Sequence, residues 1–147
     1  MNTKDYGIPQ NRSRVYIVGN KEGSFNWPER TEMGDIQSCV DHTNITQTPW
    51  GRKYSLNRVN PMGVFIDADF IHYTSYPSSH MYSPCVLARP SSLWCKQYHR
   101  YATCKEFLSL QGFDRFKQVV CNSRAKKQIG NSMSVNVVKA IIEELVK

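Results

Sequence analysis

The distribution of apolar and polar positions divides the 147-residue chain into three parts. Near the amino terminus, the apolar and β-branched run Val15–Val18 follows a turn marked by Gly7 and Pro9, which predicts a short strand buried on both faces. From about residue 20 to residue 99, glycine and proline break the pattern into short pieces, so we expect short strands and loops there. Helical periodicity follows from residue 100 onward.

A helix is predicted within Arg100–Phe113. Thr103 and Glu106 have the spacing of a capping box, in which each side chain satisfies a free backbone donor at the helix start. Gly112 stands where a left-handed residue ends a helix. These signals describe a structural element, and we expect no chemistry from it.

A second helix is predicted at the carboxyl end from an apolar stripe with the spacing i, i+3, i+7, i+10. The stripe consists of Val135, Val138, Ile142 and Leu145. Three polar side chains ahead of it are candidates for capping, namely Asn131, Ser132 and Ser134. We expect Gly130 to let another part of the backbone approach closely.

Three polar side chains alternate where the first predicted strand begins. In an extended chain, Gln10, Arg12 and Arg14 lie on one face at intervals of roughly 6–7 Å. One face of that segment therefore carries an amide and two guanidinium groups. An Arg-x-Arg pair by itself is more typical of two surface arginines beside an edge strand.

Composition and charge restrict the class of protein. The length fits one domain, or one small domain with part of another, and 40% hydrophobic residues suffice for a core. The net charge of +7 favours a polyanionic partner without identifying it. No apolar run of about 20 residues and no signal peptide is visible, so we expect no membrane span and no secretion.

The cysteine pattern indicates a reducing environment. The five cysteines are odd in number and contain no C-x-x-C pair, so we expect free thiols in an intracellular compartment, cytoplasm or nucleus. Cys95, His99 and Cys104 lie near one another, but their spacing matches no common zinc pattern. We therefore predict no metal site.

Aromatic and basic residues interleave between residues 20 and 99, which suits a nucleic-acid surface. An equally simple interpretation is that the aromatic residues form the small core of a loop-rich region. The residues are Trp27, Arg30, Trp50, Arg52, Lys53, Tyr54, Arg58, Tyr73, Tyr76, His80, Tyr82, Arg89, Trp94 and Lys96.

Three stretches in order resemble conserved blocks of the DNA cytosine-C5 methyltransferases. The string Tyr6–Gly19, with Gln-x-Arg-x-Arg at its centre, resembles the eighth block, and Arg100–Phe113 resembles the ninth. Gln128–Ser132, followed by Val137, resembles the tenth. Cys85-Val86 stands where many members have Thr-Leu, so the base-reading residues stay unassigned. Lys105 replaces a usual arginine of the ninth block, which weakens a planar, multi-donor contact.

The resemblance implies a fold and a division of the chain. The fold would be α/β, the carboxyl-terminal portion of a Rossmann-like S-adenosylmethionine-dependent methyltransferase domain with an inserted, irregular, mostly β target-recognition subdomain. Residues 1–19 would end the catalytic domain, residues 20–99 would form the recognition region, and residues 100–147 would supply a bracing helix and a helix that returns to the core. A strand so near Met1 lacks an obvious neighbour, so we expect the ancestral sequence to extend further upstream.

The resemblance also implies methyl transfer from S-adenosyl-L-methionine to C5 of cytosine in double-stranded DNA, as in restriction–modification systems. Gln10, Arg12 and Arg14 would support catalysis, Arg14 at the cytosine or its phosphate and Arg12 at the backbone and catalytic loop. Asn131 and Ser132 would border the cofactor. The Pro-Cys nucleophile block, the Glu-Asn-Val block and the Phe-x-Gly-x-Gly loop of the family precede the eighth block, and none occurs here.

Pro84-Cys85 follows the eighth block, so Cys85 is not expected to be the nucleophile. The chain would therefore need a complementing N-terminal methyltransferase subunit. The alternatives are a non-catalytic DNA-binding module and a truncated relic, and one branch of the family methylates transfer RNA. No feature of the sequence favours an RNA substrate.

Overall fold

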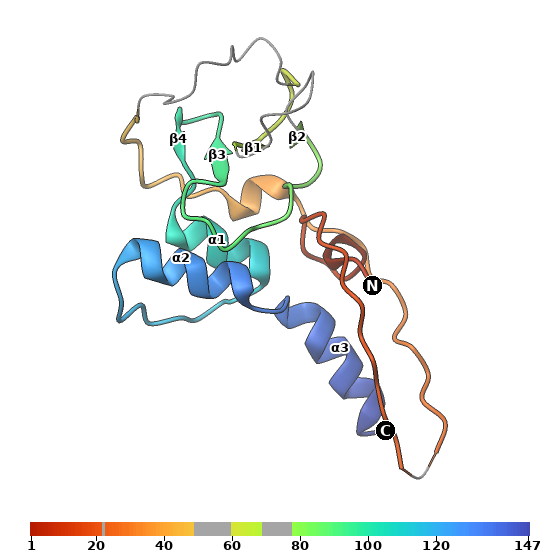
Figure 1. The fold of residues 1–147 in the computed structure, drawn as a ribbon. Coiled ribbons are helices and arrows are strands. Elements are labelled where there is room, and N and C mark those ends of the chain that lie inside the picture. The colour runs from red at the N-terminus through yellow and green to blue at the C-terminus, as the bar shows by residue number, and fades with distance from the viewer. Residues whose placement is uncertain (22, 49–59, 69–77) are drawn as a thin grey trace.

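The computed structural model describes residues 1–21, 23–48, 60–68 and 78–147. Within these ranges a small antiparallel sheet lies against two packed helices, α1 and α2, while a third helix, α3, points away from them (Figure 1). The amino-terminal segment runs beside α3 (Figure 1). The fold is mixed α/β, as the sequence predicts.

The sheet has the order β2–β1–β3–β4, and all its neighbouring strands are antiparallel. The strands are Phe65–Asp67 (β1), Ser78–Ser79 (β2), Leu93–Cys95 (β3) and Arg100–Tyr101 (β4). They confirm the prediction of short strands for the described part of residues 20–99. Seven of the aromatic and basic residues expected on a nucleic-acid surface lie outside the described residues: Trp50, Arg52, Lys53, Tyr54, Arg58, Tyr73 and Tyr76.

Side chains alternate across the sheet with the period of two that a strand imposes. The pair Phe65 and Cys95 joins the main core, which also holds Phe107 and Leu110 from α1. The next pair, Ile66 and Trp94, is buried on the opposite face. Both faces of the central strands are therefore covered, and Trp94 belongs to the core.

Helix α1 spans Cys104–Gln111 and has the capping box and the left-handed end that its sequence predicts. The Thr103 hydroxyl accepts from the Glu106 amide, the Glu106 carboxylate accepts from the Thr103 amide, and Gly112 has φ = +82°. The helix begins directly after Thr103, as the capping box predicts, and Arg100–Tyr101 ahead of it pairs with β3 as strand β4.

Helix α2 spans Asn122–Asn131 and was not predicted. Its sequence is mostly polar, and only Ala125 and Ile129, one turn apart, are buried apolar side chains on the face toward α1. Two 3₁₀ turns complete the described elements, η1 at Thr3–Asp5 and η2 at Ile36–Cys39.

Helix α3 spans Val135–Leu145, but the apolar stripe predicted for it faces the wrong way. Val137 and Ile141 are buried against Tyr6, whereas Ile142 is 50% exposed and Leu145 is 41% exposed. The helix is apolar on two sides, and the described residues of this chain cover only one of them. The expected stripe is the uncovered side.

The side-chain capping predicted at the start of α3 is also absent. Ser134 is the N-cap residue, but it makes no side-chain cap. Its hydroxyl instead pairs with the hydroxyl of Thr3 at 2.7 Å and donates to Gln111 at 3.1 Å. The residue therefore links the start of α3 to η1 and α1.

The prediction of a strand at Val15–Val18 that is buried on both faces is wrong for this chain. Tyr16 and Val18 pack on α3, while Val15 is 88% exposed and Ile17 is 94% exposed. The segment alternates as a strand does, but α3 is the layer that covers it and no described element lies over its other side. One apolar edge of the segment is left in solvent.

Candidate functional site

The Gln-x-Arg-x-Arg segment lies beside the segment 83–88. The amide of Ser83 donates to the carbonyl of Pro9, and the amide of Asn11 donates to the carbonyl of Ser83, both at 2.8 Å. Gln10 and Ser83 form a parallel bridge between the two segments. The polar block at the amino end is thereby placed against the end of the expected recognition region.

Gln10 is completely buried and holds two other parts of the chain. Its Nε2 donates to the carbonyl of Leu110 at the end of α1. Its Oε1 accepts from the amide of Val86 at 3.0 Å. The side chain therefore uses both its donor and its acceptor inside the protein.

Arg12 is 5% exposed, and its guanidinium donates to backbone carbonyls from two directions. Nη1 donates to Val86 O at 2.7 Å, and Nη2 donates to Gly130 O at 3.1 Å and Ser132 O at 2.8 Å. Burial lowers the pKa of Arg12, the Cys85 sulfur opposes this effect, and the cation of Arg14 adds to it. An arginine remains charged under such a shift.

Arg14 is the exposed member of the group. Its Nη1 donates to the carbonyl of Ser13 at 2.7 Å, and its Nη2 lies 3.7 Å from the Cys85 sulfur. Arg12 Nη1 lies 3.4 Å from the same sulfur. The two arginines thus reach one space, as their alternation predicts, and Arg14 has donors at the surface that a phosphate or a base could accept.

Cys85 lies at the same site as these arginines, although its position in the sequence gave no reason to expect it there. Its half-buried sulfur lies between the two guanidinium groups. The other contacts of this region that sequence reasoning missed are carbonyl and amide groups of Val86 and Gly130. Backbone groups carry no residue-type signal, so only the structure identifies them.

Asn131 and Ser132, the expected cofactor-side residues, lie where α2 ends. Asn131 is the last residue of α2 and is exposed, and Ser132 follows it with its hydroxyl donating to Ile129 O at 2.6 Å. Gly130 confirms the predicted close approach, because a Cβ placed there would lie 2.3 Å from the carbonyl of Leu87. The turn therefore packs directly on the segment 83–88.

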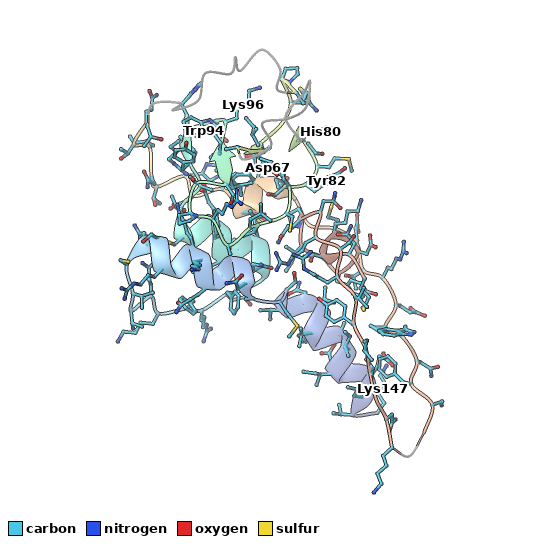
Figure 2. The ribbon with its side chains drawn as sticks, in the orientation of Figure 1. Asp67, His80, Tyr82, Trp94, Lys96 and Lys147 are labelled. Carbon is cyan, nitrogen blue, oxygen red and sulfur yellow. The ribbon has the colours of Figure 1, made fainter. Side chains whose placement is uncertain are left out.

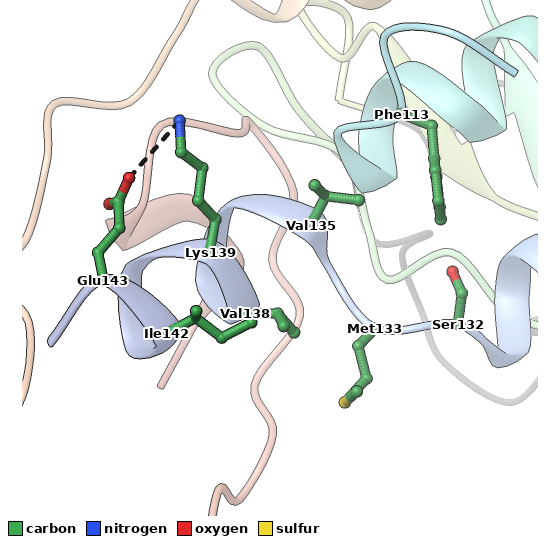
Figure 3. A pocket seen from close by; sticks show the side chains of 8 residues that line it. All are labelled: Phe113, Ser132, Met133, Val135, Val138, Lys139, Ile142 and Glu143. Carbon is green, nitrogen blue, oxygen red and sulfur yellow. Dashed lines mark ion pairs between the residues drawn. The ribbon is translucent and has the colours of Figure 1, made fainter. Parts of the chain in front are cut away.

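An apolar pocket of about 450 Å³ opens beside this turn. Figure 3 shows Phe113, Ser132 and Met133 on one side and Val135, Val138 and Ile142 of α3 on the other. Lys139 and Glu143 form an ion pair at the rim, 3.8 Å apart (Figure 3). The pocket surface is almost entirely apolar, and the hydroxyl of Ser132 beside it is engaged with the carbonyl of Ile129.

A buried ion pair joins strand β4 to helix α1. Arg100 and Glu106 are joined by two hydrogen bonds of 2.8 Å, and Arg100 also donates to the carbonyls of Asp41 and Asn44. Burial by itself lowers the pKa of Arg100, but the hydrogen bonds and charge of Glu106 outweigh it and raise that pKa. This network ties residues 41–44 to α1.

The remaining candidates of the aromatic and basic group are spread over several settings (Figure 2). Lys96 donates to the carbonyls of Asn60 and Pro61, His80 is exposed, and the ammonium of Lys4 lies 4.8 Å from the ring centre of Tyr82. In the described part of the chain, no group of three or more metal-binding side chains occurs.

The whole chain, residues 1–147, matches the family model for C-5 cytosine-specific DNA methylases. The chain belongs to this family. The three sequence blocks that suggest the family are thus part of a similarity that extends from end to end.

Several curated relatives are Type II methyltransferases. The chain is 31% identical to M.NlaX of Neisseria lactamica over 99% of this chain and 50% of the relative. It is 30% identical to M1.ScrFI of Lactococcus lactis subsp. cremoris, covering 98% and 41%, and 32% identical to M.SsoII of Shigella sonnei, covering 97% and 42%. The chain therefore spans half or less of the length of these relatives.

Proposed function

We propose that this chain is the carboxyl-terminal part of a DNA cytosine-C5 methyltransferase and works only together with an N-terminal half that carries the Pro-Cys nucleophile. The assembled enzyme would transfer a methyl group from S-adenosyl-L-methionine to C5 of cytosine in double-stranded DNA. Family membership over the full chain, together with coverage of at most half of the relatives named above, carries the proposal.

The uncovered apolar surface supports an N-terminal half as partner. The pocket beside Ser132 continues into a second one of about 430 Å³, lined by the segment 15–19 and by Met133, Ile142 and Leu145. Single exposed apolar residues are ordinary, but adjoining apolar pockets along a whole helix face mark an interaction surface. We assign this surface to the part of the relatives that the chain does not cover.

The site residues would have different roles according to whether they are exposed or buried. Attack on C6 of cytosine needs a thiolate, a carboxylic acid near N3, and a base flipped out of the duplex, and we assign the first two to the N-terminal half. Arg14, with its exposed guanidinium, would contact the flipped cytosine or its phosphate. Gln10 and Arg12 would support it from within the protein.

We assign one wall of the cofactor site to Asn131 and Ser132. The exposed amide of Asn131 and the hydroxyl of Ser132 lie at the edge of the apolar surface that we assign to the N-terminal half, and they would contact the polar part of S-adenosylmethionine. When bound, the cofactor supplies the activated methyl group. The residues of this chain would hold and orient it.

Residues 20–99 would form an inserted target-recognition subdomain on double-stranded DNA, between the end of the catalytic α/β domain at 1–19 and the bracing part at 100–147. The net charge of +7 favours a polyanion. The buried pair of Arg100 and Glu106 supports the bracing role, because Arg100 also holds the carbonyls of Asp41 and Asn44 within this region.

Two further observations bear on the setting of the enzyme. All five cysteines are free, which supports a reducing intracellular compartment. In the described part of the chain no helix is long and apolar enough to span a bilayer. We propose a restriction–modification role, since the relatives named above are Type II methyltransferases.

The test of the site uses an enzyme assembled from this chain and the part of the Neisseria lactamica relative that the chain does not cover. Arg14→Ala should lower methyl transfer about 10–100-fold, the equivalent of one charged hydrogen bond. The matched control is Arg124→Ala, which removes an exposed positive charge from α2 away from the block. Equal effects of the two variants would refute the assignment of Arg14.

A DNA-binding module without catalysis is the alternative function. It predicts that the isolated chain binds duplex DNA with strong salt dependence, while no N-terminal half confers methyl transfer. The two functions therefore differ in the outcome of the assembly experiment.

A further inference from the structure

Three segments that are distant in sequence meet at the buried guanidinium of Arg12. They are the block 9–12, the segment 83–88 and the turn 129–132, and we call their meeting point the Arg12 junction. Both peptide groups of Val86 are held by the block, its amide by Gln10 at 3.0 Å and its carbonyl by Arg12 at 2.7 Å. The segment 83–88 is therefore fixed to the block at Val86.

The other side of the same guanidinium holds the turn. Nη2 of Arg12 donates to the carbonyls of Gly130 and Ser132, which flank the cofactor-side residue Asn131. The turn also contacts the segment 83–88 directly, since Gly130 leaves no room for a Cβ against Leu87. One side chain thus joins the end of the recognition region to the edge of the apolar pocket.

The geometry requires arginine. A planar guanidinium presents donors in two directions at fixed angles, whereas the ammonium of lysine is a point charge on a flexible stem. In the described part of the chain, the partners of the Arg12 guanidinium are carbonyl oxygens and the Cys85 sulfur. A lysine could satisfy the carbonyl of Val86 or those of the turn, but it could not span both.

We propose that Arg12 is a positioning residue that sets the place of the cofactor-side turn relative to the DNA-recognition segment, so that the two binding sites support one another. The proposal rests on the proposed function for its binding partners. Arg12 is buried and its η-nitrogens are engaged with carbonyl groups, so it would act through Ser132 and Val86 and would touch neither substrate.

The first measurement is hydrogen–deuterium exchange of the isolated full chain, followed by mass spectrometry. In Arg12→Lys, peptides covering 83–88 and 129–134 should both exchange at least tenfold faster, while α1 stays protected. Arg100→Lys is the matched control, because it weakens an equally buried arginine that does not contact the turn. It should leave 129–134 unchanged.

A second variant keeps the test decisive if Arg12→Lys does not fold. Gly130→Ala leaves Arg12 in place but drives a methyl group into the backbone of Leu87. It should accelerate exchange in the same two segments. A response in only one segment, or in neither, would overturn the junction.

The second measurement uses the enzyme assembled with an N-terminal half. Arg12→Lys should raise the KM for S-adenosylmethionine and for DNA about tenfold each and change kcat less than threefold, whereas Arg100→Lys should leave the KM for S-adenosylmethionine within twofold. Unchanged KM values in an active Arg12→Lys enzyme would refute the positioning role. Lack of transfer by the wild-type assembly would instead count against the proposed function, and the exchange result would still decide the junction.

Discussion

Adjacent isoleucines of α3 provide a direct test of which helix face this chain covers. Ile141 is 8% exposed and packs with Tyr6 and Val137, although it also borders the second pocket, whereas Ile142 is 50% exposed and lines both pockets. Replacing either by alanine removes the same three carbons and changes the helix propensity equally. The two variants therefore differ only in burial.

The expected magnitudes follow from the transfer free energy. Three buried carbons are worth about 2.4 kcal/mol at ~0.8 kcal/mol each, and a cavity adds to this, so Ile141→Ala should lower the free energy of unfolding by about 3 kcal/mol. Ile142→Ala loses at most half of that transfer free energy, because the side chain is already half exposed, and it leaves no closed cavity. Ile142→Ala should cost about 1 kcal/mol or less.

The assay is urea denaturation of the isolated chain, read as the free energy of unfolding at constant slope. A difference of about 2 kcal/mol between the variants confirms that Ile141 faces the core. In an enzyme assembled with an N-terminal half, Ile142→Ala should weaken association by roughly tenfold or more, about 1.4 kcal/mol. Equal destabilisation of the isolated chain by both variants would refute the account of α3.

Three further predictions concern charge and thiols. Glu106→Gln should lower the free energy of unfolding by about 3–5 kcal/mol in denaturant melts, because it leaves the Arg100 guanidinium buried without its carboxylate; a loss below 1 kcal/mol would contradict this. Burial raises the pKa of Asp41, but hydrogen bonds from Thr43 and the nearby Lys105 hold it below its ordinary value. Its stabilising contribution is therefore present above the ordinary aspartate pKa of about 3.9 and lost as the pH falls through the lower folded pKa, so wild type and Asp41→Asn should converge in stability as the pH is lowered below about 3.9. A thiol reagent at pH 8 should label exposed Cys121 first, because hydrogen bonding to Ser123 lowers its pKa. It should spare Cys39 and Cys95, because burial raises the pKa of each thiol to about 11. Mass spectrometry measures the order of labelling, and early labelling of either buried thiol would contradict the prediction.

The features that the sequence predicts correctly are local. The capping box of Thr103 and Glu106 and the end of α1 at Gly112 depend on residues within two helical turns, so the sequence alone specifies them. The close approach at Gly130 was also predicted, because a residue without a Cβ lets another backbone come near. Its partner, the backbone of Leu87, was not.

The errors arise where tertiary contacts decide. Helix α3 has apolar side chains on two sides, and periodicity alone does not say which side this chain covers. The same applies to Val15 and Ile17, whose pattern fits a buried strand although they lie in solvent here. Both errors concern one surface, the surface that we assign to the N-terminal half.

The candidate site was only partly visible in the sequence. Alternation placed Arg12 and Arg14 in one space, and both reach the Cys85 sulfur. Alternation could not show that the side chains of Gln10 and Arg12 are buried and hydrogen-bonded to backbone groups, whereas Arg14 lies at the surface. Hydrogen bonds to backbone carbonyls across more than seventy residues leave no pattern of residue types.

The most direct test of the central claim is the transfer of a radioactive methyl group from S-adenosylmethionine to unmethylated duplex DNA. Three samples are compared: this chain alone, the uncovered N-terminal half of the Neisseria lactamica relative alone, and the two co-expressed. The account predicts transfer by the co-expressed pair only, and its loss when the nucleophilic cysteine of the N-terminal half is replaced by serine. Transfer by this chain alone, or a stable pair that binds DNA and S-adenosylmethionine without transfer, would contradict it.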